Sequence, residues 1–257
     1  MRPATTKPTA RHLLTHTAGF GYDWNCPAHA TYRQQQRMGG QMLIKSVEDT
    51  VPRRSITDMP AAFDAGSRFL YGASSDWLGL LVEAVSGVDL DTFCQEHIFG
   101  PLDISDMSFH ALPSFADNHT NVCCRVSESE YIAHPPWFAR QVETCQGGAG
   151  LRGSPRSFLR ILRTLLKGEV DGVRLLSPQA LDAMFSPQLS NEAVLQDLAT
   201  FIGEHCDPFE RTDKVVAKNW GLGGALYQDE LESGRAAGSM TWSGLACVSP
   251  SLTARLN

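Results

Sequence analysis

The feature that most constrains the fold of this chain is a set of apolar stripes at helical spacing, each bounded by residues that start or stop helices. The clearest covers residues 75–86. Ser75 can cap its start, Asp76 suits the positive helix N-terminus, and Gly87 stands where a left-handed C-terminal cap belongs. Its apolar residues recur every three or four positions: Trp77, Leu78, Leu81, Val82 and Val85. We expect a helix that buries Leu81 and Val82.

Three further segments predict helices in the same way: residues 89–99, 154–167 and 177–185. In the second of these, Ser154 is an N-cap, Pro155 takes the first helical position and Gly168 follows the end. Its stripe should bury Ile161 and Leu165. We also expect a short helix capped by Thr9 and a polar surface helix within residues 31–47.

The C-terminal part predicts strands. Residues 220–227 and 237–246 are suited to two strands, and the polar stretch with Gly234 and Arg235 between them suits a hairpin turn. Residues 247–257 lose all periodicity, so an irregular tail is expected there.

Charge and hydropathy limit the partners. The formal net charge is −6, and phosphate binding needs a basic surface, so we expect no nucleic-acid partner. No apolar run approaches the roughly 20 residues that span a bilayer, which argues against a membrane. The first residues carry a charge but no apolar stretch of a secretory signal. These features favour a soluble cytoplasmic protein.

Cysteine and histidine spacing gives no metal site. The seven cysteines include no Cys-x-x-Cys pair, and the adjacent Cys123 and Cys124 cannot easily pair with each other. Free thiols are the simpler interpretation. His12 and His16, at i and i+4, suit either a metal pair or two loop anchors that hydrogen-bond to the backbone; we favour anchors. We predict neither a metal nor a cofactor.

Two segments carry a family resemblance: residues 11–21 (RHLLTHTAGFG) and residues 69–77 (FLYGASSDW). Together they resemble the serine β-lactamase and penicillin-binding superfamily, on its class C and family VIII esterase side. The resemblance implies a β-lactamase/transpeptidase-like α+β fold, with an antiparallel sheet flanked by helices and a mainly helical subdomain. Residues 1–246 would form part of such a domain, here incomplete.

The resemblance assigns a catalytic role to Tyr71. The family's second motif is Tyr-x-Asn or a relative, and its tyrosine acts as base or proton shuttle for a serine hydroxyl. A phenol titrates near ~10, so nearby cations would have to lower that value. Here the motif is Tyr71-Gly72-Ala73, and the change from Asn to Ala73 favours ester or acyl-transfer chemistry over β-lactam hydrolysis. The alternative is a packed tyrosine before a capped helix.

Two more segments imply substrate contacts. Residues 238–246 (GSMTWSGLA) resemble the Trp-x-Gly form of the family's third motif, with Trp242 and Gly244 in place. We expect an edge strand there, with a backbone N–H directed at an acyl oxyanion. Gly147 and Gly148 lie in a glycine-rich turn that resembles a pocket-side turn of the esterases. That turn lacks the Gly-Lys-Ser/Thr ending of a phosphate loop.

The family's nucleophile motif, Ser-x-x-Lys, does not occur in these 257 residues, and only ten residues precede the segment at 11–21. Residues 4–7 (ATTK) and 164–167 (TLLK) are similar to this motif. The first has Ala in place of serine and lies too close to His16, and the second lies at the end of a predicted helix, whereas the catalytic serine needs the start of one. Gly-x-Ser-x-Gly is absent too. The sequence therefore predicts a chain truncated at both ends relative to the family, and impaired in activity.

The leading hypothesis is a β-lactamase-related serine hydrolase: a carboxylic ester hydrolase or acyltransferase that takes a small-molecule ester, thioester or other acyl donor. A side-chain transesterase of secondary metabolism is the alternative within enzymes. The alternative from another class is a non-catalytic remnant that acts as a binding or interaction module.

Overall fold

The computed structural model describes residues 2–36, 53–115, 122–134, 142–205, 217–232, 234–244 and 251–252. The chain divides into two compact units. The first unit comprises Met1–Gly21, Ala61–Ser74 and Phe158–Asn257, and the second comprises Tyr22–Pro60 and Ser75–Ser157. The architecture is α+β, as expected, with helices and a small antiparallel sheet. Within the described residues, no helix is both long and apolar enough to cross a lipid bilayer.

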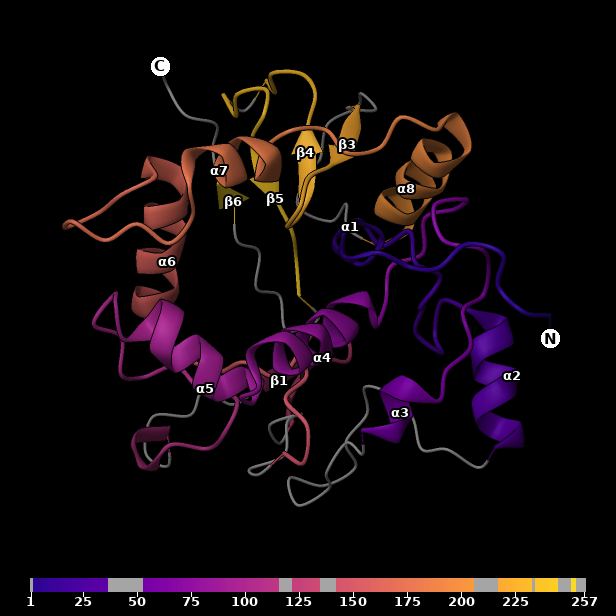
Figure 1. The fold of residues 1–257 in the computed structure, drawn as a ribbon, viewed down its shortest axis with the longest axis horizontal. Helices are drawn as coiled ribbons and strands as arrows, with labels where there is room; N and C mark the ends of the chain where they lie inside the picture. The colour runs from indigo at the N-terminus through magenta and orange to yellow at the C-terminus, as the bar shows by residue number, and fades with distance from the viewer. Residues whose placement is uncertain are drawn as a thin grey trace. The chain divides into compact units, whose positions relative to one another are not determined.

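The sheet of the first unit has four antiparallel strands in the order β3-β4-β5-β6 (Figure 1). They are β3 (Lys218–Trp220), β4 (Ala225–Tyr227), β5 (Met240–Thr241) and β6 (Ser251–Leu252). Residues 220–227, expected as one strand, instead contain a tight turn, in which the Gly221 N–H donates to the Gly224 carbonyl at 2.8 Å. A Cβ at Gly224 would lie 2.9 Å from the Thr241 carbonyl oxygen, so the turn approaches β5 too closely for a side chain.

Strand β6 lies in the segment for which an irregular tail was expected. Its Leu252 pairs with Met240 and its Ser251 with Thr241. Strand β5 therefore has a neighbour on each side, and the expectation that it forms a sheet edge is wrong. The pairing depends on backbone hydrogen bonds. A strand of two residues is too short to show an alternation of apolar and polar side chains, so nothing in the sequence indicated it.

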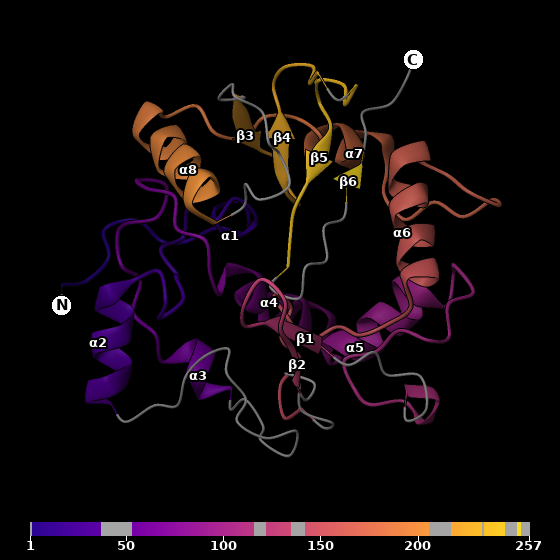
Figure 2. The same cartoon turned by 180° about the vertical axis from the view of Figure 1, so that it is seen from behind.

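Helices of the first unit pack against this sheet in two separate clusters of side chains. Helix α8 (Glu192–His205) lies beside β3 in both views (Figures 1 and 2), and its Val194, Leu198 and Ile202 pack with Trp220 and Ala225. Helix α6 (Pro155–Lys167, of which Pro155–Ser157 belong to the second unit), helix α7 (Pro178–Met184) and the residue after α7 supply the side chains that pack against Leu226 and Met240: Leu162, Leu166, Met184 and Phe185.

The predicted caps of these helices are present. The Ser154 hydroxyl accepts the Ser157 N–H at 3.2 Å at the start of α6, and Gly168 follows its end with φ +78°. Ser177 caps α7 through the Ala180 N–H. Thr9 caps α1 (Ala10–Leu14). Ile161 and Leu165 are only half-buried, so the prediction that they are buried is wrong; Thr164 between them is the buried residue of α6.

The second unit is mainly helical. It contains α2 (Pro27–Gln35), α3 (Arg54–Thr57), α4 (Ser74–Ser86, of which Ser74 belongs to the first unit), α5 (Leu90–Cys94), the π-helical turn η1 (Gln95–Phe99) and the 3₁₀ turn η2 (Pro113–Phe115). A hairpin, β1 (Val122–Arg125) with β2 (Tyr131–His134), completes it. The polar helix expected within residues 31–47 begins earlier, at Pro27, and residues 37–52 lie outside the described residues.

Helix α4 matches its expected bounds to within one residue, and Gly87 follows it with φ +79°. Its buried face differs from the prediction. Leu80 is 5% exposed, Leu81 is 38% exposed and Val82 is half-buried. The helix has apolar residues on several sides, so spacing alone could not determine which stripe would be covered.

Candidate active site

Tyr71 lies in the short segment that leads into α4, and backbone contacts fix this segment. The Leu70 N–H donates to the His16 carbonyl at 2.9 Å. On the other side of Tyr71, a Cβ on Gly72 would lie 2.3 Å from the Phe20 carbonyl oxygen. Only glycine fits there, which explains physically why glycine follows the tyrosine.

Trp242 follows β5 and meets Tyr71 directly. Its indole Nε1–H donates a hydrogen bond of 3.1 Å to the Tyr71 hydroxyl, and the two rings lie 4.8 Å apart at 50°. An indole N–H is a donor only, so the phenolic oxygen is the acceptor and this bond does not use its proton. The structure thus brings together two predicted site residues that lie in separate sequence motifs.

Four more rings surround this pair, and we call the six together the aromatic cluster: His16, Phe69, Tyr71, Phe201, Trp220 and Trp242. His16 lies 4.6 Å from Tyr71, and Phe201 of α8 lies 5.2 Å from it on ring centroids. Trp220 meets Trp242 edge-on at 4.6 Å. Such tilted and edge-to-face arrangements are favourable for aromatic rings.

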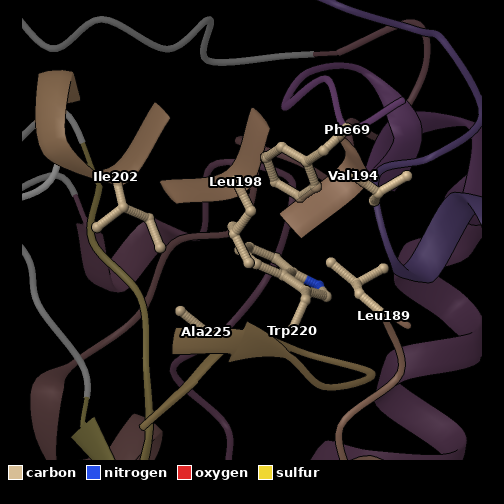
Figure 3. Packing of buried hydrophobic residues seen from close by; sticks show 7 residues of the cluster. All are labelled: Phe69, Leu189, Val194, Leu198, Ile202, Trp220 and Ala225. Atoms are coloured by element: carbon tan, nitrogen blue, oxygen red, sulfur yellow. The ribbon is translucent and has the colours of Figure 1, made fainter. Parts of the chain in front are cut away.

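Trp220 joins the aromatic cluster to the hydrophobic core. Its indole lies among Phe69, Leu189 and Leu198 (Figure 3), and its Nε1–H donates to the Leu14 carbonyl at 3.0 Å. The Asp197 carboxylate of α8 accepts the Phe69 N–H at 3.1 Å and is paired with Arg68. The segment before Tyr71 is thereby held to α8 and to β3.

His16 differs from the backbone anchor that the sequence predicted. It is buried with φ +53°, a left-handed conformation that few side chains adopt, and its Nδ1 has no hydrogen-bond partner among the described residues. Burial lowers the pKa of His16 to about 3. The ring is therefore neutral at pH 7 and adds no positive charge beside Tyr71. The Nδ1 of His12, in contrast, accepts the Thr9 N–H as an anchor would.

Gly147 and Gly148 belong to the second unit, where they pack against the start of α4. A Cβ on Gly147 would lie 2.4 Å from the Ser75 carbonyl oxygen. The Gly148 N–H donates to the Asp76 carboxylate at 3.0 Å, so that donor is already used within this unit. Substrate contact by either glycine stays a prediction.

Asp76 has a different role from the one its position suggested. It is 1% exposed, and its carboxylate binds the glycine-rich turn instead of a helix N–H. Burial raises the pKa of Asp76 to about 6, and the Gly148 N–H opposes that rise. The carboxyl group is a structural link between α4 and the turn.

Gly244 is exposed and follows Trp242 near the end of the described segment. Its predicted substrate contact also stays a prediction. Two serines beside the motifs are buried: Ser74 after Tyr71, and Ser239, whose hydroxyl donates to the Ala236 carbonyl at 2.7 Å. Thr164, which starts the second mimic of Ser-x-x-Lys, is buried and donates to the Arg160 carbonyl.

Sequence reasoning missed Phe201 and the helix that carries it. The signal was available, because Val194, Leu198 and Ile202 recur at helical spacing after Asn191, whose side chain accepts the Ala193 N–H as a cap. No comparable signal marked the ring contacts of His16, since a histidine in a glycine-rich loop gives no indication of its burial.

Comparison with known proteins identifies relatives of this chain. Residues 1–247 match the protein family described as Beta-lactamase. The chain is 32% identical over 256 residues to the monacolin J acid methylbutanoyltransferase of Aspergillus terreus, a match that covers 95% of this chain and 58% of that relative. It is 31% identical to the lovastatin esterase of Penicillium rubens, covering 94% of this chain and 60% of the esterase.

Among solved structures, the LovD6 mutant of simvastatin synthase (LovD) from Aspergillus terreus superimposes with a TM-score of 0.79 at 30% identity. That match covers 95% of this chain and 56% of the synthase. The chain thus spans less than two thirds of the length of these relatives. Because the family match extends over nearly all of its residues and agrees with the observed α+β architecture, this chain belongs to the beta-lactamase family.

Proposed function

We propose that this chain provides the tyrosine and third-motif parts of an acyl-transfer site that acts on small-molecule carboxylic esters or thioesters. The observation that carries the proposal is the hydrogen bond from the Trp242 indole to the Tyr71 hydroxyl. It sets the phenolic oxygen at one position. The relatives named for methylbutanoyl transfer and for lovastatin esterase activity support the same chemistry.

In the proposed reaction, a serine hydroxyl attacks the carbonyl carbon of the acyl donor. Tyr71 as phenolate takes the serine proton and passes it to the departing alcohol or thiol, so that the acyl group stays on the serine. Water or a second alcohol then attacks this acyl-serine and gives its proton to Tyr71. Tyr71 returns that proton to the departing serine oxygen, so the product leaves and the serine hydroxyl and the Tyr71 phenolate are restored. A positioned acid–base group of this kind contributes about 10²–10⁴-fold to the rate.

The sequence contains no Ser-x-x-Lys, so the assay needs two proteins. One is the chain of 257 residues, and the other is the same chain extended upstream through an in-frame Ser-x-x-Lys read from the coding DNA. We expect the extended protein to hydrolyse a short-chain p-nitrophenyl ester with a burst and to react with a fluorophosphonate. We expect the shorter protein to do neither, since Ser74 and Ser239 are buried.

Tyr71→Phe in the extended protein tests the role of the phenol. It should lower the rate of acylation by about 10²–10⁴-fold while the protein stays folded. Tyr131→Phe, at an exposed tyrosine of β2, is the matched control and should keep the parent rate. A Tyr71→Phe protein as fast as the parent would refute the proposal. Ester binding without turnover in the extended protein would favour a binding module instead.

A further inference from the structure

Three side chains with different metal-binding atoms meet in the second unit, in a group that the acyl-transfer proposal does not use. They are Asp89, His110 and Cys145, and one ligand atom from each lies within 4.8 Å of the other two. Cys145 is 4% exposed, whereas Asp89 and His110 are exposed. The group is therefore open to solvent on the carboxylate and imidazole side and closed behind the sulfur.

Hydrogen bonds hold the segments that carry Asp89 and His110 in place. Asp89 caps α5, where its carboxylate accepts the Thr92 N–H at 3.0 Å and the Thr92 hydroxyl at 2.6 Å. The segment of His110 is tied to the same helix, because the Asp91 carboxylate accepts both the Phe109 N–H at 2.7 Å and the Ser108 hydroxyl at 2.9 Å. The Ser108 hydroxyl oxygen in turn accepts the His110 N–H.

The third segment is fixed by close packing. A Cβ on Gly79 of α4 would lie 3.7 Å from the Cys145 carbonyl oxygen and 3.6 Å from the Gly147 nitrogen. The backbone at Cys145 thus lies directly against α4, two residues before Gly147. The three candidate metal ligands come from separate segments, and each segment is fixed by hydrogen bonds or close packing.

The charge around the sulfur also favours a cation. The carboxylates of Asp91, Asp89 and Glu83 all lie close enough to Cys145 to act on it electrostatically. Arg53 pairs with Glu83 at 3.0 Å. For Asp89 and Asp91, the described residues supply no Lys or Arg ion pair. Two carboxylates beside a thiol and an imidazole leave local negative charge that a bound cation would neutralise.

We propose that Asp89, His110 and Cys145 bind one zinc ion. Sulfur, imidazole nitrogen and carboxylate oxygen are the three donor types that zinc takes in proteins, and a thiol together with an imidazole argues against calcium or magnesium. The bound ion links the N-terminus of α5, the His110 segment and the chain entering the turn at residues 147–150. It therefore stabilises the second unit.

The same three residue types could instead form a nucleophilic triad. Burial of the Cys145 sulfur speaks against that assignment, because a nucleophile has to meet its substrate whereas a ligand has only to meet an ion. Alkylation with iodoacetamide separates the two. A metal ligand should be protected from alkylation by zinc, whereas a nucleophile that binds no metal should react at the same rate with and without zinc.

Titration of the metal-free, reduced chain with Co²⁺ tests the proposal, because a cobalt–thiolate bond gives a charge-transfer absorption in the near ultraviolet. We expect this band to saturate at one equivalent and to disappear when Zn²⁺ is added. Zinc should also raise the melting temperature, since an ion that binds only the folded state stabilises it.

Three variants and one control make the result specific. Cys145→Ser should abolish the charge-transfer band. Asp89→Asn keeps the helix cap and should, like His110→Ala, weaken cobalt binding by at least about tenfold, the loss that even outer groups of metal sites produce. Cys94→Ser removes another buried thiol on which Asp91 acts and should leave the band unchanged.

The proposal fails if the band persists in Cys145→Ser, or if both Asp89→Asn and His110→Ala bind cobalt as tightly as the parent. The last two changes are at exposed positions, so they keep the test valid even if Cys145→Ser does not fold. Each variant is checked by far-ultraviolet circular dichroism before titration.

Discussion

The Trp242 indole N–H donates to the Tyr71 hydroxyl at 3.1 Å, and the two residues are 171 positions apart in the chain. This bond joins the segment that precedes α4 to the segment that follows β5. Both residues are only partly buried, yet both pack against the same hydrophobic core, so the pair lies where a rigid interior meets solvent.

A double-mutant cycle measures that bond. Tyr71→Phe and Trp242→Phe each remove one partner, and both keep a ring in the aromatic cluster. We expect a coupling free energy of about 0.5–1.5 kcal/mol between them in urea denaturation, the usual net contribution of one hydrogen bond. Purely additive effects would mean that the contact contributes nothing to the folded state.

Gly72→Ala should destabilise the protein and displace Tyr71, because the added Cβ would meet the Phe20 carbonyl oxygen at 2.3 Å. We expect a loss of about 1–3 kcal/mol in the free energy of unfolding, as is usual for overpacking. Gly203→Ala in α8 is the matched control, since a Cβ there meets nothing within 4 Å. It should gain up to about 1 kcal/mol from helix propensity. Equal effects of the two changes would contradict the structure.

The buried Asp76 carboxyl makes a pH-dependent contribution to stability. Its pKa is raised to about 6 in the folded protein from an ordinary value of 3.8. Between these values the folded state holds a proton that the unfolded chain has released, so the free energy of unfolding falls as the pH rises through this window.

Asp76→Asn removes that ionisation and keeps an oxygen for the Gly148 N–H. The free energy of unfolding of this variant, relative to that of the parent, should therefore rise between about pH 4 and pH 7. The rise should be on the order of 2–3 kcal/mol, since one pKa unit corresponds to about 1.4 kcal/mol. Denaturant melts at several pH values measure this difference. A constant difference between the two proteins would show that Asp76 ionises as freely in the folded state as in the unfolded chain.

His16 should produce the opposite dependence in acid. Its pKa is lowered to about 3 by burial, from an ordinary 6.5, so the unfolded chain gains a proton first and stability falls as the pH drops from 6.5 towards 3. Asn tolerates the left-handed backbone at this position, so His16→Asn is the variant of choice.

We expect His16→Asn to be less stable than the parent at pH 7, because it loses contacts with Tyr71 and Trp220. Its stability should then depend less steeply on pH between about 6 and 4. Identical slopes for the two proteins, measured by the same denaturant melts, would indicate that His16 takes up its proton as readily in the folded state as in the unfolded chain.

The sequence by itself determined local structure where a residue type strongly favours one position, such as the start or the end of a helix. Ser154, Ser177 and Thr9 start helices because their hydroxyls bind free N–H groups, and Gly87 and Gly168 follow helix ends at positive φ. These interactions lie within a few residues, so their pattern can be read along the chain. The motif segments also predicted Tyr71 and Trp242 as site residues, and the structure shows that these two side chains are in contact.

Only the tertiary structure decided which surfaces meet. Leu80 rather than Leu81 is covered on α4, β6 pairs with β5, and the Asp76 carboxylate binds Gly148 instead of its own helix. Each of these depends on a segment distant in sequence, and spacing along one element carries no information about that partner. His16 shows the same limit, because its neutrality and its contact with Tyr71 both follow from burial by residues that come later in the chain.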